Sequence, residues 1–201
     1  MDLFGHDSTA NLLPRDGIAR YHGPVMTGAE ADRFFHRLEQ TIPWQQDELV
    51  MFGKRITTAR KVAWFGGPGL AYTYSGTTKH PLPWTPELLE LKALAERLSG
   101  AAFNSCLLNL YHHGGEGMGW HSDDEKSIVP DSTIASFSFG TARKFAFRHK
   151  HTGETVSLCP AHGSLLEMAG GCQAHWQHSL PKTKKVTTPR INLTFRLMRQ
   201  L

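Results

Sequence analysis

The stretch Pro189-Arg190-Ile191-Asn192-Leu193-Thr194-Phe195-Arg196 alternates polar and apolar side chains over the length of a strand. Successive side chains on a β-strand point to opposite faces, so one face would be apolar and the other would carry both arginines. That second face is either solvated or folded around an anion, because a buried unpaired guanidinium is costly. Guanidinium groups bind carboxylates bidentately, so a buried arrangement would suit a dicarboxylate. The strand by itself leaves both alternatives open.

Short segments of similar texture fill the chain beyond residue 103. Lys144-Phe-Ala-Phe-Arg148 is a second clear alternation, and Gly and Pro separate the segments. The predicted strands are Ser105–Tyr111, Thr133–Phe139, Lys144–Arg148, Thr155–Leu158, Ser164–Met168 and Ile191–Leu197, with two more in Val50–Gly53 and Lys61–Tyr74. A run of short strands with turn residues between them is typical of a β-sandwich or barrel.

Two predicted helices precede this run. Thr27-Gly-Ala-Glu30 is a capping-box pattern that opens a helix through about Gln40. Thr85-Pro86 begins a second helix, and Gly100 is a natural C-cap. Residues 1–25 contain several Gly and Pro and are predicted to be irregular. Helices followed by strands indicate an α+β fold.

Composition narrows the class of protein. A chain of 201 residues predicts a single domain over 1–201. With 40% hydrophobic and 20% charged residues it is neither disordered nor fibrous. Its three cysteines form no CxxC pair, which disfavours a disulfide scaffold and a cysteine-based zinc site and suits a reducing compartment. No segment resembles a signal peptide or a membrane span, so we expect no membrane partner.

Positive charge gathers in the last third of the chain. Residues 141–201 contain 10 Lys and Arg but only two Asp and Glu, whereas the whole chain has a net charge of +4. This asymmetry suits an anionic partner such as nucleic acid, and a solubilising face is the alternative. A phosphate-binding footprint would draw on Arg143, Arg148, Lys150, Lys182, Lys184 and Lys185.

His121-Ser-Asp123 is the segment most suggestive of metal chemistry. On an extended segment the two residues share a face, so an imidazole and a carboxylate could hold one ion. The third ligand would come from His175 or His178. Two histidines and one carboxylate form the iron site of non-haem Fe(II) oxygenases. A His-x-Asp pattern also arises by chance, so it does not decide the matter alone.

Several motifs together resemble the AlkB family of Fe(II)- and 2-oxoglutarate-dependent nucleic-acid dealkylases, and within it the homologues that act on double-stranded DNA. The resemblance covers about residues 45–198. It rests on Asn109-Leu-Tyr111, His121-Ser-Asp123, His178 and Arg190-x-Asn192-x-x-x-Arg196, and on the stretches Met51–Lys54, Ala71–Gly76, Phe137–Gly140, Phe145–Lys150, Ala161–Leu166 and His175–Pro181. It implies a double-stranded β-helix, or jelly roll, over about 104–201, and helices with a nucleotide-recognition lid over about 26–103.

The resemblance also implies roles for individual residues. Its iron ligands would be His121, Asp123 and His178, which form the catalytic centre with O2. Its residues for 2-oxoglutarate would be Asn109, Tyr111, Arg190, Asn192 and Arg196. Asp124 would contact the exocyclic group of a flipped base, and Tyr72 and Tyr74 would lie in the nucleotide-recognition strand. Arg148 and Lys150 would contact the DNA.

Phe52 has two interpretations. An apolar residue beside Lys54 and Arg55 could be a wedge that enters the base stack, or it could be a core residue of a hairpin. The resemblance favours the wedge. The loop His151-Thr-Gly-Glu154 is shorter and less basic than its counterpart in the duplex-acting homologues, so the preference between duplex and single-stranded DNA is open.

The resemblance therefore implies a DNA repair dioxygenase. It would flip N1-methyladenine or N3-methylcytosine out of alkylated DNA and release the methyl group as formaldehyde. The alternatives are a 2-oxoglutarate oxygenase that acts on RNA or a protein side chain, and a DNA-binding module with a non-catalytic metal. We expect a monomer, in a bacterial cytoplasm or, in a eukaryote, the nucleus.

Overall fold

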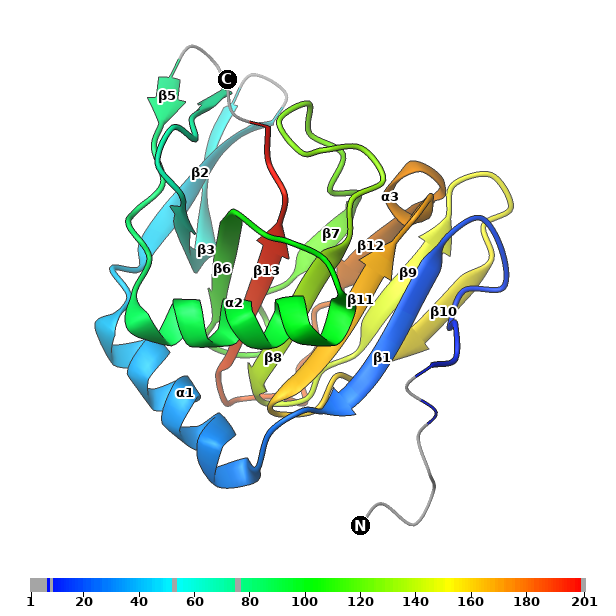
Figure 1. The fold of residues 1–201 in the computed structure, drawn as a ribbon, viewed down its shortest axis with the longest axis horizontal. Coiled ribbons are helices and arrows are strands. Elements are labelled where there is room, and N and C mark those ends of the chain that lie inside the picture. The colour runs from blue at the N-terminus through cyan, green and yellow to red at the C-terminus, as the bar shows by residue number, and fades with distance from the viewer. Residues whose placement is uncertain (1–6, 8, 52–53, 75–76, 200–201) are drawn as a thin grey trace.

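The computed structural model describes residue 7 and residues 9–51, 54–74 and 77–199. The chain forms antiparallel sheets with few helices (Figure 1). The elements in chain order are β1 (Ile18–Pro24), α1 (Gly28–Thr41), β2 (Gln45–Met51), β3 (Lys54–Gly66), β4 (Tyr72–Tyr74), β5 (Thr77–Lys79), α2 (Pro86–Ser99), β6 (Ser105–Tyr111), β7 (Met118–His121), β8 (Ile134–Gly140), β9 (Phe145–His149), β10 (Thr155–Leu158), β11 (Ser164–Ala169), α3 (Cys172–His175), β12 (Trp176–Leu180) and β13 (Arg190–Arg196).

Two sheets make up most of the fold. The large sheet has seven strands in the order β1-β11-β8-β13-β6-β3-β2, and the small sheet has four in the order β10-β9-β12-β7. A separate pair joins β4 and β5. From β6 to β13 consecutive strands alternate between the two sheets, except for the hairpin of β9 and β10 within the small sheet, which is the topology of a jelly roll. The predicted fold class is therefore confirmed.

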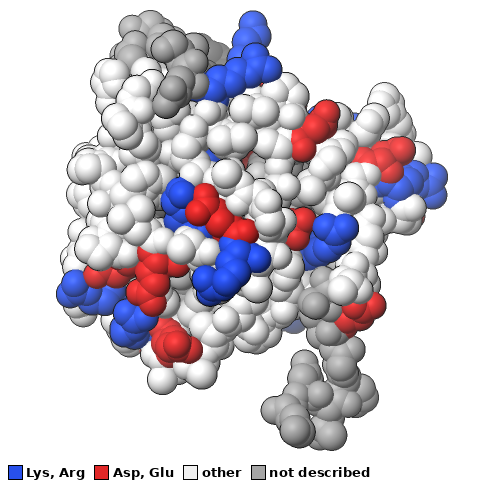
Figure 2. All heavy atoms as spheres, viewed as in Figure 1, with Lys and Arg blue, Asp and Glu red and all other residues white. Residues whose placement is uncertain are grey.

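One face of the large sheet is covered by helices, because its outward side chains are apolar. Ile191, Leu193 and Phe195 of β13 share a core with Phe34 of α1 and Leu88 of α2. Figure 1 shows α2 lying across this face with α1 beside it. Ion pairs tie the helices at the surface, and Figure 2 shows basic and acidic side chains interspersed over this side of the molecule.

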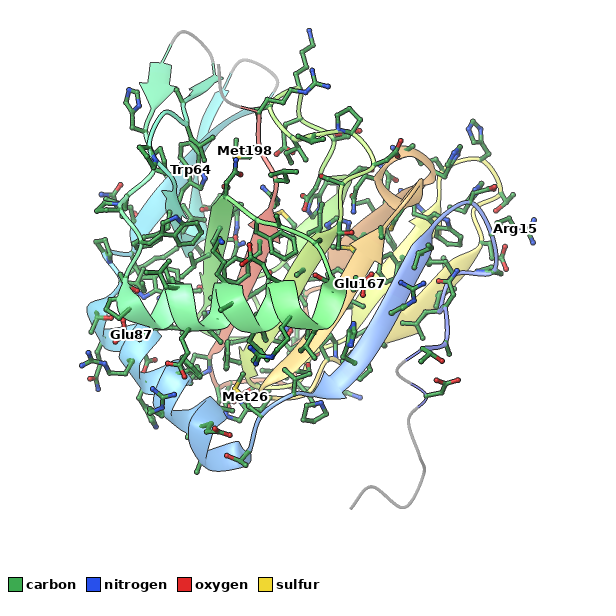
Figure 3. The ribbon with its side chains drawn as sticks, in the orientation of Figure 1. Arg15, Met26, Trp64, Glu87, Glu167 and Met198 are labelled. Atoms are coloured by element: carbon green, nitrogen blue, oxygen red, sulfur yellow. The ribbon has the colours of Figure 1, made fainter. Side chains whose placement is uncertain are left out.

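The opposite face of the large sheet meets the small sheet. Ile134 and Met168 of the large sheet pack with Phe147 and Trp176 of the small one. A further small cluster joins the last described segment to β3, where Trp64 packs beside Met198 (Figure 3). Buried polar side chains of β13 lie on this inner face, so the space between the sheets is the place for a polar site.

Both predicted helix starts are confirmed. Thr27 accepts from the backbone N–H of Glu30, and the Glu30 carboxylate accepts from the Thr27 backbone at 2.8 Å. Thr85 caps α2 through the N–H of Leu88, and Gly100 ends it with φ 68°, a left-handed conformation that glycine adopts without strain.

Three expectations about strands were wrong. Residues 18–24 are not irregular but form β1, which pairs with β11. The predicted strand Lys61–Tyr74 is two strands, because Gly66-Gly-Pro-Gly69 interrupts it. The strands β7 and β12 were not predicted at all. The strand predicted at Val50–Gly53 is also misplaced, since β2 begins at Gln45, and β3 begins at Lys54 instead of Lys61. In the C-terminal half the predicted ends shift by at most one residue, as is usual at strand termini.

The segments predicted to form a lid contain the hairpins β2–β3 and β4–β5. Their role as a lid, and the division of residues 1–25, 26–103 and 104–201, stay predictions. Among the described residues, no helix is both long and apolar enough to cross a membrane.

Candidate metal centre

Two histidines and an aspartate converge between the sheets. Strands β7 and β12 are antiparallel neighbours, with His121 directly opposite His178, so both imidazoles point to the same side. Their ring centroids are 4.3 Å apart. Asp123 follows β7, and one potential ligand atom from each of the three residues lies within 4.8 Å of the others. Within the described part of the chain, no other group of His, Cys, Asp and Glu meets this criterion.

The histidines present the form that binds metals. The Nδ1 atom of His121 is 2.9 Å from the carbonyl oxygen of Gly119, which only accepts, so the neutral imidazole has its proton on Nδ1 and Nε2 is the atom that can bind a metal. Burial lowers the pKa of His178 to about 4, despite the opposing effect of Asp123. His178 is therefore neutral near neutral pH, and the ring of Phe145 stacks on it at 5.4 Å.

Asp123, directly after β7 of the small sheet, is held ionised by a contact with the large sheet. Burial alone would raise its pKa, but Arg196 and the two histidines outweigh burial and leave the pKa below its usual value. Arg196 donates from Nη2 to Oδ2 of Asp123 at 2.9 Å. The backbone N–H of Asp123 donates to Oε1 of Gln173 at 2.9 Å, which fixes the chain at this point.

The donor set fits Fe(II). Two imidazole nitrogens and one carboxylate are the ligands of non-haem iron oxygenases, and here His178 and Asp123 are buried while His121 is half-buried. The backbone bond to His121 and the arginine on Asp123 supply the outer contacts that orient such ligands. His175 does not belong to this group. It ends α3, and its ring stacks with that of His149 at 6.3 Å.

A polar row runs from this cluster along the inner face of the large sheet. β13 lies between β6 and β8, with Arg190 opposite Tyr111 and Asn192 opposite Asn109. Both arginines of β13 have buried side chains, so the solvated-face alternative is wrong. Arg190 is 3% exposed and donates to the hydroxyl of Ser138 at 2.9 Å. Its Nε has no partner among the described residues, and burial lowers its pKa to about 10.

Asn109 and Asn192 differ in whether their side-chain amide protons are available to a ligand. Asn109 accepts at Oδ1 from Nε of Arg60 at 3.1 Å, which leaves its amide protons available. Asn192 donates to Ser136 Oγ and to the carbonyl of Phe137, both at 2.8 Å. Its amide is therefore committed to β8. The hydroxyl of Tyr111 stays protonated, because burial raises its pKa.

The predicted substrate residues are only partly brought together. Asp124 is exposed and lies 3.7 Å from the ammonium group of Lys150. Arg148 stacks over the ring of Trp120 at 4.5 Å and donates to Gln177 at 2.9 Å. Tyr72 and Tyr74 lie in β4, and their role in a nucleotide-recognition strand stays a prediction. Phe52 lies outside the described residues, so neither interpretation of it is tested.

One charge assignment was wrong, and several contacts were not predicted. Arg143 is 3% exposed, so it cannot belong to a surface phosphate footprint. Arg60, Ser138 and Gln173 contact the predicted site residues from β3, β8 and α3. No local pattern marks them, because each acts through a partner that is distant in sequence.

The comparisons with known proteins agree with this geometry. Residues 17–196 match the 2OG-Fe(II) oxygenase superfamily. The chain is 42% identical over 195 residues to mouse DNA oxidative demethylase ALKBH2, covering 92% of this chain and 82% of that protein. With human ALKBH2 the identity is 44% over 179 residues, covering 84% and 69%. With the Bos taurus alpha-ketoglutarate-dependent dioxygenase alkB homolog 3 it is 42% over 177 residues, covering 83% and 61%.

A solved structure, described as the structure of OsALKBH1, superposes with a TM-score of 0.57 at 16% identity. It matches 92% of this chain and 99% of that chain, which supports the fold. The superfamily match, the similarity to two mammalian ALKBH2 proteins and the His-Asp-His cluster lead to one conclusion. The chain belongs to the AlkB family of the 2OG-Fe(II) oxygenase superfamily, and it is a dioxygenase that uses Fe(II), 2-oxoglutarate and O2.

Proposed function

We propose that this protein is a DNA repair enzyme that oxidatively demethylates N1-methyladenine and N3-methylcytosine. The observation that carries the proposal is the cluster of His121, Asp123 and His178 in a chain over 40% identical to DNA oxidative demethylases. The exposed cations of the last third of the chain, among them Lys182, Lys184 and Lys185, support an anionic polymer as substrate. Methylation at these positions weakens base pairing, which lowers the free energy needed to extrude the base.

In this proposal, His121, Asp123 and His178 hold the iron. Asn109, Tyr111, Arg190, Asn192 and Arg196 surround 2-oxoglutarate. When bound, the metal with 2-oxoglutarate and O2 supplies the oxidising power that hydroxylates the methyl group, which leaves as formaldehyde while 2-oxoglutarate becomes succinate and CO2. Arg196 keeps Asp123 ionised, and the tautomer of His121 directs Nε2 to the metal.

The proposed contacts with the DNA substrate are assigned to residues by their places in the fold. Asp124 is exposed next to the buried Asp123, so its carboxylate suits the exocyclic amino group of a flipped adenine or cytosine. Tyr72 and Tyr74 offer aromatic rings for stacking. Arg148 and Lys150 place cations near the metal cluster for the phosphate backbone. We expect the enzyme to act as a monomer, in whichever compartment holds the DNA.

A panel of matched substrates tests the proposal. Purified protein with Fe(II), 2-oxoglutarate and ascorbate would be offered N1-methyladenine in single-stranded DNA, duplex DNA and RNA, and a methylated peptide. We expect loss of the methyl group, measured by mass spectrometry, from DNA and not from the peptide. No turnover of either DNA, with bound iron verified, contradicts the proposal. Faster turnover of RNA would replace it with the RNA alternative.

Phe52→Ala tests the wedge. If Phe52 fills the gap left by the flipped base, the variant should lose at least about tenfold in activity on duplex DNA and little on single strands. The matched control is Leu89→Ala, which removes an apolar side chain that is 49% exposed on α2. A core role for Phe52 predicts equal losses on both substrates together with a lower free energy of unfolding.

A further inference from the structure

The buried Arg143 contacts two segments that lead into the candidate site. Its Nη2 donates to the carbonyl oxygens of Glu116 and Pro181, both at 2.8 Å, and of Gly114 at 3.3 Å. Gly114 and Glu116 lie in the loop after β6, the strand of Tyr111. Pro181 directly follows β12, the strand of His178. One side chain therefore joins the proposed cosubstrate strand to the proposed metal strand.

The two segments are packed too closely for ordinary side chains. Gly114 exchanges backbone hydrogen bonds with the second segment, donating to Val186 and accepting from Thr183, both at 2.8 Å. A Cβ on Gly117 would come within 2.5 Å of the carbonyl oxygen of Leu180. The position of Tyr111 thus depends on a junction whose centre is the guanidinium of Arg143.

Positive charge is concentrated beside Tyr111. The guanidinium carbons of Arg143 and Arg190 lie 5.6 and 5.9 Å from the centre of its ring. Glu116 is the buried carboxylate near them, and it accepts from the backbone N–H of His112 at 2.9 Å and lies 3.0 Å from its Nδ1. Around Tyr111 the guanidiniums of Arg190, Arg60 and Arg143 therefore outnumber the single carboxylate of Glu116, which is shared with a histidine, and such an imbalance is costly to bury.

The hydrogen bonds of Arg143 do not account for its charge. Its Nε and Nη1 are buried without a partner among the described residues, although all three carbonyls gather at Nη2. A clamp alone would need only a neutral donor at this place. A second cation beside Arg190 instead suits a ligand that brings a carboxylate to Tyr111.

We propose that Arg143 is a positioning residue that makes the site specific for a 2-oxo dicarboxylate. It fixes Tyr111 and, together with Arg190, provides the positive charge that favours the distal carboxylate of 2-oxoglutarate. The inference rests on the proposed placement of the cosubstrate between Tyr111 and Arg190. It predicts discrimination against 2-oxopentanoate, which has the same 2-oxo acid head and chain length but no distal carboxylate.

Binding measurements without turnover test this role. The dissociation constants of 2-oxoglutarate and 2-oxopentanoate would be measured by calorimetry on protein loaded with Mn(II). Arg143→Gln keeps a donor for the carbonyls but removes the charge, so it should weaken 2-oxoglutarate about tenfold and 2-oxopentanoate less than about twofold. Arg143→Lys restores the charge and should recover most of the preference. Equal weakening of both ligands would show a clamp without a role in specificity and overturn the proposal.

Two further measurements separate the possible failures. Lys144→Gln removes a neighbouring exposed cation and should leave both dissociation constants unchanged. If wild-type protein does not prefer 2-oxoglutarate, the proposed cosubstrate placement fails whatever Arg143 does. If Arg143→Gln does not fold, hydrogen exchange on the wild type decides. 2-Oxoglutarate should protect the amides of Gly114 and Thr183 more than 2-oxopentanoate does, and equal protection contradicts the proposal.

Discussion

The two ends of β13 hold buried arginines in opposite electrostatic settings. At one end Arg196 is 2.9 Å from the carboxylate of Asp123, so the protein neutralises its own charge there. At the other end Arg190 contacts the hydroxyl of Ser138, and among the described residues no carboxylate forms an ion pair with it. A strand with two similar arginines thus supports the metal ligand at one end and leaves positive charge for a ligand at the other.

The largest effect is expected at the neutralised end. Arg196→Met would leave the buried Asp123 without its main partner, and the free energy of unfolding should fall by about 3–5 kcal/mol. Urea denaturation measures the change. Adding Asp123→Asn to the same chain should recover much of the loss, because no buried charge then lacks a partner.

Arg199→Met is the matched control, since Arg199 is an exposed arginine three residues further along. Its free energy of unfolding should change by less than about 0.5 kcal/mol. If Arg196→Met is equally mild, the two ends of β13 do not differ as described.

At the Arg190 end, a substitution should weaken the binding of 2-oxoglutarate and should not lower the free energy of unfolding. Arg190→Met removes the charge proposed to hold 2-oxoglutarate, and the dissociation constant should rise about 100-fold. The free energy of unfolding without cosubstrate should hold or increase, because a guanidinium with an unpartnered Nε leaves the interior. Calorimetry and urea denaturation together test this split. If Arg190→Met lowers the free energy of unfolding as much as Arg196→Met does, the two ends of β13 do not differ in their electrostatic setting.

A smaller effect, on the affinity for Fe(II), is expected near Asp123. Gln173→Ala removes the acceptor for the backbone N–H of Asp123, and affinity for Fe(II) should fall about tenfold. Gln177→Ala removes a glutamine that contacts Arg148 instead, and its metal affinity should match the wild type. Anaerobic equilibrium dialysis gives both values. Equal affinities in the two variants would remove Gln173 from the support of the metal site.

Much of this fold was predictable where local pattern and tertiary structure agree. The alternation in Arg190–Arg196 predicted a strand with two different faces, and the capping residues Thr27 and Thr85 predicted both helix starts. The metal-binding residues of the candidate site were also predictable from the sequence. The His-x-Asp spacing, read with the family resemblance, selected His178 over His175, and the structure groups His178 with His121 and Asp123.

What was missed depends on pairing between distant segments. β7 is four residues long and contains a glycine, so its sequence lacks a strand pattern, yet it pairs with β12 and sets His121 opposite His178. β1 is likewise stabilised by its pairing with β11. Arg143 was assigned to the surface because a cation between strands is usually exposed. Nothing in its neighbourhood in the sequence shows that three carbonyls surround it.

In the proposed function, the cluster of His121, Asp123 and His178 couples oxidation of 2-oxoglutarate to removal of a methyl group from DNA. The most direct test quantifies succinate and formaldehyde together in reactions on an oligonucleotide containing N1-methyladenine. Wild-type protein should release the two products in equal amounts, and His178→Ala should release neither. Formaldehyde release by His178→Ala, or succinate without formaldehyde from the iron-loaded wild type, would contradict the account.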